Sequence, residues 1–276
     1  MQYKIKNINK LPSGHINEDK LAIEEPLEIV IQYQEGSQNV SKVIAITMRT
    51  PGMDEDLVSG FLYSESLIQH YSDIESITPR FDCANFELTF QTIVVQLKNG
   101  IKPNLKSIDR NFYVSSSCGV CGKSAIEALE PQYGIFLNKM APIVNYKVLL
   151  DLPEKMKKYQ KLFYHTGGIH ACALFDQDGE LLFVAEDVGR HNALDKLIGQ
   201  YISKHKHQAE QTILLLSGRV SFEMVQKSLS IGIPVIAAIG APSSLAVELS
   251  ETFGQTLVGF MRGESANIYS HPQRIK

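Results

Sequence analysis

The chain has 276 residues, of which 44% are hydrophobic and 21% charged, so it carries enough apolar side chains for a large folded core. Its formal net charge of −3 argues against a general nucleic-acid or membrane-surface binder. The first residues form no apolar signal core, and no stretch reaches the roughly 18 apolar residues of a membrane-spanning helix. We therefore expect a cytoplasmic protein whose four cysteines are free thiols or ligands.

The region up to residue 112 predicts a small mixed-sheet α+β domain. A helix beginning near Asp54 is indicated by apolar residues at helical spacing from Glu55 to Ile68. Apolar, β-branched runs predict strands on both sides of it, the first two joined by a turn near Gly36. The predicted strands cover 27–33 and 43–48, and 86–90 and 93–97 are predicted to form one long strand or two short ones.

From residue 113 to 276 the pattern changes to alternating strands and helices. Strands are predicted over 171–175, 181–185, 211–216, 235–239 and 256–260, and helices over 192–204, 222–231 and 243–253. Several of these strands are continuous apolar runs, which are typical of a sheet covered by helices on both faces. The chain is thus expected to be α/β, with a three-layer α/β/α domain after the smaller one.

Two of the four cysteines, Cys118 and Cys121, lie three residues apart within a stretch rich in Gly and Ser. A helical pattern begins at Lys123, and a thiol at a helix N-terminus faces unpaired N–H groups that favour the thiolate. The thiolate is the form that attacks sulfur, binds a metal or carries a persulfide.

A Cys-x-x-Cys pair alone leaves three interpretations open: half of a zinc site, a thioredoxin-like redox pair, or a sulfur carrier. The other cysteines, Cys83 and Cys172, are single and far apart, so a second pair of zinc ligands is missing. We expect no bound metal. A thioredoxin pair would lie close to the start of its domain, behind a first strand, whereas this pair lies in mid-chain.

Polar residues follow three of the predicted strands, where ligands bind in such sheets. Arginine guanidinium groups and the backbone N–H groups of Gly-containing loops can bind phosphates. Taken singly, each loop is more simply interpreted as an ordinary turn. No Gly-x-Gly-x-x-Gly or Walker-type loop occurs, so a nucleotide would be held in another way. The candidate residues are Ser217, Arg219, Ser243, Phe260, Met261, Arg262, Gly263, Glu264 and Ser265.

Two histidines are candidate acid–base or ligand-contact groups. His170 follows Thr166-Gly167-Gly168-Ile169, and His191 follows a charged run that starts at Glu186 and leads into a helix. The charged run has an equally simple reading as a helix-capping arrangement.

These residues assemble into a pattern that resembles the FdhD family. The matching segments are spread over most of the chain, and the most specific are the Cys-Gly-Val-Cys loop and an Asp-Val-Gly-Arg-His-Asn-Ala run. They comprise 48–52, 60–62, 117–122, 166–170, 186–196, 217–219, 241–246, 259–260 and 267–269.

The resemblance implies that the protein is a sulfurtransferase required for formate dehydrogenase activity. A cysteine desulfurase would load a persulfide on Cys118, with Cys121 as the second loop cysteine. The sulfur would then pass to the Mo-bis(molybdopterin guanine dinucleotide) cofactor, which GDP-like nucleotides would mimic in part. The resemblance further implies a cytidine-deaminase-like fold for 113–276, a homodimer, and a guanine-dinucleotide segment at Phe260–Ser265.

The sequence departs from the family at Ser265, where the family often has Arg, and Arg262 is the residue that could replace that contact. A zinc deaminase would need Pro-Cys-x-x-Cys with an upstream His-x-Glu or Cys-x-Glu, but Ser117 precedes Cys118 and no such triplet lies upstream. A non-catalytic chaperone that binds cofactor and formate dehydrogenase is the alternative function.

Overall fold

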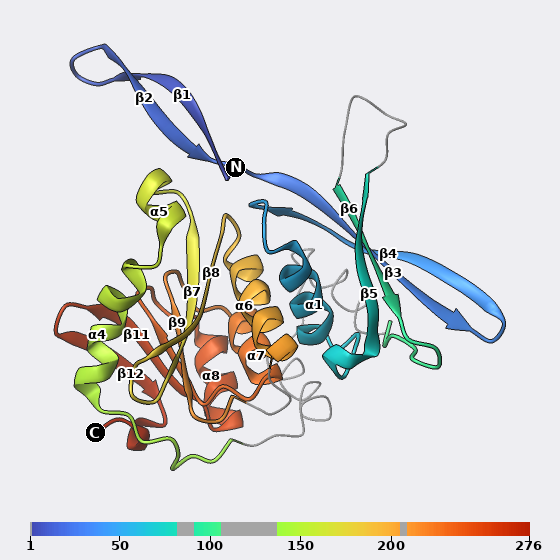
Figure 1. Ribbon diagram of the computed structural model, residues 1–276. Helices are drawn as coiled ribbons and strands as arrows, with labels where there is room; N and C mark the ends of the chain where they lie inside the picture. The colour runs from blue at the N-terminus through green and yellow to red at the C-terminus, as the bar shows by residue number, and fades with distance from the viewer. Residues whose placement is uncertain (1, 82–90, 106–136, 205–208) are drawn as a thin grey trace.

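The structure is a computed structural model that describes residues 2–81, 91–105, 137–204 and 209–276 (Figure 1). The predictions for Cys118, Cys121, the helix after Lys123 and the strand 86–90 lie outside the described residues. So does the predicted domain boundary at residue 112, which stays a prediction.

The N-terminal part consists of a hairpin and a four-stranded sheet. Strands β1 (Tyr3–Lys10) and β2 (His15–Ala22) pair with each other and project from the body of the molecule (Figure 1). The sheet has the order β4-β3-β6-β5. Its strands are β3 (Glu25–Glu35), β4 (Gln38–Arg49), β5 (Ile74–Phe81) and β6 (Gln91–Leu97).

Helix α1 (Asp54–Ser64) packs its apolar side on one face of this sheet, and a short 3-10 turn, η1 (Tyr71–Asp73), precedes β5. The predicted extension of the helix to Ile68 is wrong. The backbone turns at Ser66, whose φ is +57°, and Leu67 and Ile68 are buried beyond that turn. Because these two apolar residues are buried, the apolar spacing in the sequence extends beyond the end of the helix, which explains the wrong boundary. The hairpin β1–β2 and strand β5 had no counterpart in the prediction.

The C-terminal part is a six-stranded sheet in the order β12-β11-β10-β9-β7-β8. Strands β9 (Thr212–Leu216), β10 (Val235–Ala238) and β11 (Thr256–Arg262) are parallel and almost entirely buried. Strands β7 (His170–Asp176) and β8 (Leu181–Asp187) form the predicted hairpin, and β12 (Ser265–Ser270) pairs antiparallel with β11.

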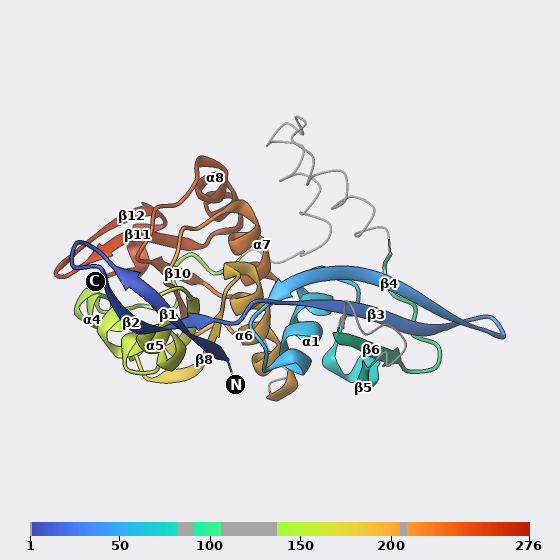
Figure 2. The same cartoon turned by 90° about the horizontal axis from the view of Figure 1, so that it is seen from above.

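Helices cover both faces of this sheet, as the apolar strands predicted (Figure 2). Helices α6 (Arg190–Lys204), α7 (Phe222–Ser230) and α8 (Ser244–Phe253) pack on one face, and α4 (Tyr146–Lys157) packs on the other. Helix α5 (Lys161–Thr166) lies at the start of β7 and contacts β2, and the 3-10 turn η2 (Pro272–Arg274) ends the chain. The three-layer α/β/α architecture is therefore confirmed, and its likeness to cytidine deaminase stays a prediction.

Two details of the C-terminal prediction need correction. The strand predicted over 256–260 continues to Arg262 and is not the last one, because a tight turn at Gly263 leads into β12. Helices α4 and α5 were not predicted. The ends of α8 agree with the sequence signals, since the Ser243 hydroxyl accepts the Ala246 N–H and Gly254 adopts φ +78°.

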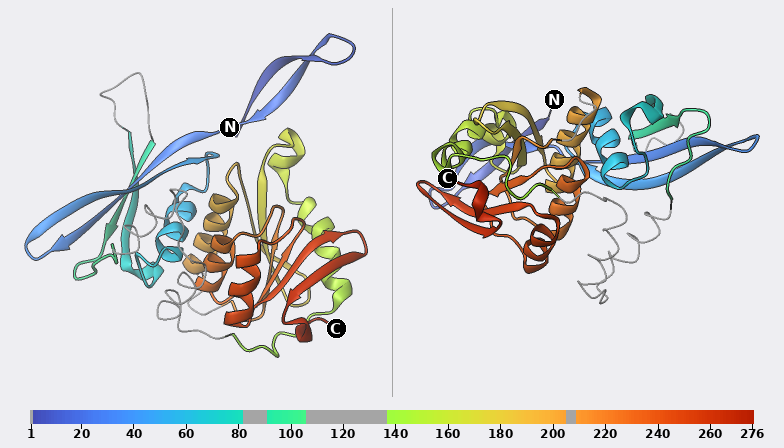
Figure 3. Two further views of the ribbon diagram at one scale, coloured as in Figure 1. Left: turned by 180° about the vertical axis from the view of Figure 1, so that it is seen from behind. Right: turned by 90° about the horizontal axis from the view of Figure 1, so that it is seen from below.

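Helices α1 and α6 join the two parts, with α1 lying between the N-terminal sheet and α6 (Figure 3). Glycines make this contact very close. A Cβ placed on Gly60 would lie 1.9 Å from the Asp195 carbonyl oxygen, and one on Gly199 would lie 1.9 Å from the Asp56 carbonyl oxygen. Only residues without a side chain allow the helix backbones to approach in this way.

Candidate functional site

Most of the candidate residues meet at one edge of the six-stranded sheet. Because β9, β10 and β11 are parallel, their carboxyl ends lie at the same edge. Strand β7 runs antiparallel to β9, so it starts there with His170, and β8 ends there with Asp187. The ends of five neighbouring strands thus form what we call the carboxyl edge.

Backbone hydrogen bonds connect the loops along the carboxyl edge. The Phe260 N–H donates to the Gly240 carbonyl at 3.1 Å, and the Gly240 N–H donates to the Gly218 carbonyl at 3.3 Å. Gly218 in turn lies against His170, since a Cβ placed on it would be 3.2 Å from the histidine Nδ1. The Ser217 hydroxyl accepts the Ala171 N–H at 2.9 Å, so Ser217 serves partly to fix the start of β7.

Phe260 has the most unusual conformation at this edge. Its φ is +53°, in the left-handed region that costs a non-glycine residue about 1–3 kcal/mol, and its side chain is 38% exposed. The Arg262 guanidinium carbon lies 5.8 Å from the centroid of the Phe260 ring. The strained backbone and the exposed ring make Phe260 a candidate position for contact with a ligand.

The rest of the 260–265 segment is a β-hairpin turn rather than a free loop. Arg262 pairs with Ser265 across the turn, and the Ser265 hydroxyl donates to the Arg262 carbonyl. Arg262, Gly263, Glu264 and Ser265 are all exposed. Met261 has 2% of its surface exposed and packs in the core, so only its backbone can reach a ligand.

Arg219 and Ser243 are exposed beside the same edge. Ser243 is already engaged as the N-cap of α8, and the Val220 carbonyl accepts its N–H. The structure therefore brings the predicted residues at the start of β7, after β9, before α8 and on β11 together at one edge.

The residues at the start of α6 add further polar groups to the carboxyl edge. The His191 Nε2 lies 3.1 Å from the Glu223 carboxylate at the start of α7. This hydrogen bond lowers the pKa of Glu223 to about 2. Burial, followed by the positive charge of Arg190, lowers the pKa of His170, which favours its neutral form at neutral pH. Sequence reasoning did not select Arg190, although it directly precedes His191.

The charged run before α6 has mainly internal roles, which agrees with the capping interpretation. The Glu186 carboxylate accepts the N–H groups of Leu162 and Phe163 at 2.8 Å each, at the start of α5. Asp187 is fully buried, and its carboxylate lies 2.7 Å from the Nζ of Lys196.

Cys172 is the one cysteine within the described residues, and it cannot take the role of a sulfur carrier in the folded protein. It is 1% exposed, its Sγ is 4.0 Å from the Arg190 carbonyl oxygen, and burial raises its pKa. A buried, protonated thiol is a poor nucleophile.

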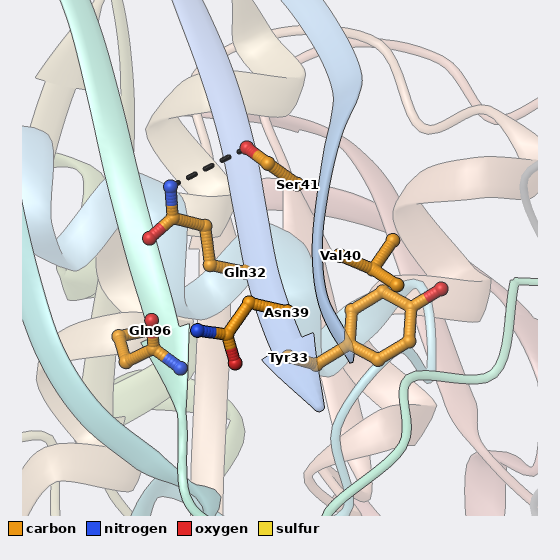
Figure 4. A pocket seen from close by; sticks show the side chains of 6 residues that line it. All are labelled: Gln32, Tyr33, Asn39, Val40, Ser41 and Gln96. Atoms are coloured by element: carbon orange, nitrogen blue, oxygen red, sulfur yellow. Dashed lines mark hydrogen bonds between the residues drawn. The ribbon is translucent and has the colours of Figure 1, made fainter. Parts of the chain in front are cut away.

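Within the described ranges, no group of three His, Cys, Asp or Glu side chains is arranged to hold a metal ion. The same part of the chain contains no helix with the length and apolar character needed to cross a membrane. A hollow of about 310 Å³ lies elsewhere, on the N-terminal sheet, and it is lined by side chains that include Gln32, Ser41 and Gln96 (Figure 4). It does not belong to the carboxyl edge.

The sequence model of the FdhD/NarQ family matches residues 22–276. The chain belongs to the FdhD/NarQ family. It is 42% identical to the sulfur carrier protein FdhD of Sulfolobus acidocaldarius, covering 100% of this chain and 99% of the relative. Sulfur carrier proteins FdhD of Streptomyces coelicolor and Mycobacterium tuberculosis are also 42% identical over 93% of this chain, covering 89% and 92% of their own lengths.

The fold is similar to a solved structure over its whole length. A crystal structure described as a formate dehydrogenase accessory protein, from Desulfotalea psychrophila, superposes with a TM-score of 0.73 at 24% sequence identity. The alignment covers 100% of both chains. This likeness supports the fold, and the family membership rests on the sequence comparisons.

Proposed function

We propose that this protein is a sulfur carrier that takes persulfide sulfur from a cysteine desulfurase and passes it to Mo-bis(molybdopterin guanine dinucleotide) for formate dehydrogenase. Cys118 would carry the sulfur and Cys121 would assist its release. The observation that carries the proposal is the row formed at the carboxyl edge by exposed Phe260 and Arg262 and, on the neighbouring strands, Gly240, Gly218 and His170. Relatives named sulfur carrier protein FdhD that match this chain nearly end to end support it.

The carboxyl edge offers the contacts that a guanine nucleotide needs. The Phe260 ring can stack on the base, because base–aromatic stacking contributes about 1–3 kcal/mol. Arg262 and Arg219, both exposed, can pair with phosphate oxygens, and the N–H of the exposed residue Gly263 can donate to them. In this proposal Arg262 supplies the cation that Ser265 lacks. His170, His191, Ser217 and Ser243 would contact the rest of the cofactor.

The sulfur chemistry needs one nucleophile and one source of electrons. The Cys118 thiolate attacks the outer sulfur of the desulfurase persulfide, a new S–S bond forms, and the desulfurase cysteine leaves as thiolate. Attack of the Cys121 thiolate on the Cys118 sulfur then releases the outer sulfur as hydrosulfide to the cofactor. The resulting Cys118–Cys121 disulfide is reduced by a cellular dithiol. In this scheme Cys121 affects release and not loading.

Persulfide loading is tested by mass spectrometry after incubation with a cysteine desulfurase and cysteine. The wild type should gain about 32 Da, lost on reduction, and Cys118→Ala should abolish the gain. Cys172→Ala is the matched control and should load normally, because that thiol is buried. Formate dehydrogenase activation by Cys118→Ala would refute sulfur transfer and favour the chaperone alternative.

Nucleotide binding is tested by thermal shift with GDP. A hundredfold excess over Kd stabilises the folded state by roughly 2.7 kcal/mol, which is several degrees at about 2–4 °C per kcal/mol. Phe260→Ala and Arg262→Ala should shrink the shift. Leu182→Ala removes a similarly exposed apolar side chain, 44% against 38%, at the other end of the sheet and should leave it unchanged. No shift for the wild type would refute the nucleotide site.

The proposed assembly is a homodimer, which light scattering coupled to gel filtration would test. A mass of about 30.8 kDa at micromolar concentration would contradict it, since that is the mass of one chain.

A further inference from the structure

The segment Asp187–Asn192 places Arg190 and His191 at the carboxyl edge. It is held by hydrogen bonds to Thr50, a residue of the N-terminal part. The Thr50 N–H donates to Asp187 Oδ2 at 3.1 Å, and the Val188 N–H donates to the Thr50 hydroxyl at 3.2 Å. Thr50 and Asp187 are 137 positions apart in sequence, so this contact forms only in the folded protein. We call this segment the 187–192 segment.

Lys196 completes the attachment. Its Nζ lies 2.7 Å from Asp187 Oδ2 and donates to the Thr50 carbonyl at 2.8 Å. The side chains of Lys196 and Asp187 are 1% and 0% exposed, and Thr50 is fully buried. The ammonium group therefore holds both halves of the contact, the acidic side chain of the segment and the backbone of Thr50.

The other Asp187 oxygen shapes the segment itself. Asp187 Oδ1 accepts the Gly189 N–H at 2.9 Å, and it lies 3.4 Å from the amide nitrogen of Asn192. That same amide nitrogen donates to the Met48 carbonyl at 2.8 Å, and Thr47 donates its hydroxyl to Asn192 Oδ1. The segment is thus fixed at its beginning, middle and end by groups from the end of β4 and the residue after it.

Burying a charged pair is expensive, and an apolar pair of similar size is often as stable or more stable. A gain in stability alone therefore does not explain why Asp187 and Lys196 are paired in the core. The pair instead fixes the conformation of the residues that follow Asp187. Among them is Arg190, whose Nε is buried with no hydrogen-bond partner among the described residues. His191 is held in the same conformation against Glu223.

We propose that Thr50, Asp187 and Lys196 are positioning residues that fix Arg190 and His191 for contact with the phosphates of the nucleotide substrate. The inference rests on the proposed nucleotide site and adds a subsite to it, on the side of the carboxyl edge away from Phe260. It also assigns a role to the N-terminal part, because Thr50 holds a segment of the C-terminal sheet. None of the three positioning residues touches the substrate in this proposal.

The test replaces the Thr50 hydroxyl with a methyl group of nearly equal volume. Thr50→Val removes the acceptor of the Val188 N–H and keeps both backbone contacts, whereas Thr50→Ser keeps the hydroxyl. Lys227→Met is the structural control. It removes another buried ammonium paired with α6, through Asp195 at 2.9 Å, without touching the 187–192 segment. Lys196→Met serves as the stronger variant wherever it folds.

Two measurements are made on each folded variant. The first is the titration of the Glu223 carboxyl by NMR, which reports on the contact between His191 and Glu223 and needs no nucleotide. In Thr50→Val the Glu223 pKa should rise from about 2 towards its ordinary value. The second is calorimetric binding of GDP and guanosine. The Kd for GDP should rise about two- to tenfold, as expected for one lost hydrogen bond, and that for guanosine should not change.

Wild-type behaviour of Thr50→Ser and Lys227→Met, together with both changes in Thr50→Val, would support the proposal. An unchanged Glu223 titration and unchanged GDP affinity in Thr50→Val would overturn it, as would equal effects in Lys227→Met, which would indicate general loosening. A shifted Glu223 titration with no GDP binding by the wild type would support the positioning of His191 and refute the nucleotide site itself.

Discussion

Gly60→Ala tests the close contact between α1 and α6, because two physical effects predict opposite changes in the stability of the protein. Within an isolated helix, replacing Gly by Ala stabilises by about 1 kcal/mol. In the folded protein, the new Cβ would lie 1.9 Å from the Asp195 carbonyl oxygen, about 1.5 Å short of the 3.4 Å at which ordinary contact begins. The obstacle is helix backbone, which cannot move aside as a flexible side chain can.

The two helices would have to separate, and overpacking of a tight contact costs about 1–3 kcal/mol or occasionally more. Since the obstacle is backbone, we expect the upper end of this range, which at about 2–4 °C per kcal/mol lowers Tm by about 6–12 °C. Gly199→Ala, whose Cβ would lie 1.9 Å from the Asp56 carbonyl, should behave alike.

The assay is thermal unfolding followed by circular dichroism, with urea unfolding to obtain free energies. Gly168→Ala is the matched control, because the nearest atom to its Cβ would be 3.8 Å away and its φ is not positive. It should change Tm by less than about 2 °C. A Tm for Gly60→Ala equal to or above that of the wild type would refute the helix contact, since propensity alone would then explain the result.

Three further predictions concern buried or paired groups. In a variant whose other three cysteines are changed to serine, the buried thiol of Cys172 should react with Ellman's reagent only after unfolding. Rapid reaction of the folded variant would contradict the burial of Cys172. The Glu223 pKa is about 2 in the folded state, below its ordinary value of 4.5, so its contact with His191 stabilises above pH 4.5 and is lost as pH falls towards 2. Urea unfolding of Glu223→Gln should therefore converge with the wild type over that window, and a pH-independent difference would disprove the pairing. Lys227→Met should cost about 3–5 kcal/mol because it leaves Asp195 unpaired and buried, whereas Lys102→Met, with its 62%-exposed side chain, should cost less than about 1 kcal/mol in the same urea assay.

The sequence predicted the buried part of the fold well, because burial on both faces leaves a continuous apolar run. Strands β9 and β10 are such runs, and their positions agree with the structure to within a residue. The hairpin β1–β2 lies mostly in solvent, so its residues carry no apolar pattern. Helix α4 contains Pro153, which normally ends a helix but here lies in its eighth position.

The candidate site could be predicted as far as it depends on strand order. Residues after parallel strands meet at one edge, which placed Ser217, Arg219 and Phe260 together. The conformation of Phe260 could not be predicted, because a φ of +53° is unfavourable for that residue and depends on tertiary contacts. The partners of Asp187 could not be predicted either, since Thr50 comes from a distant part of the chain.

The motifs by which the chain resembles its family therefore divide into two physical groups. One group consists of segments that bind each other: Thr50, directly after β4, holds the 187–192 segment, and Lys196 contacts both. The other group lies at the carboxyl edge and includes Arg219 and Arg262, whose side chains are exposed. Substitution in the first group should change stability and positioning together, whereas substitution in the second should change ligand affinity at constant stability. The charged run at 186–196 belongs to both, because its acidic and Lys residues face inward while Arg190 and His191 face the edge. A single motif can thus connect the fold to the site, and the Thr50→Val comparison separates the two contributions.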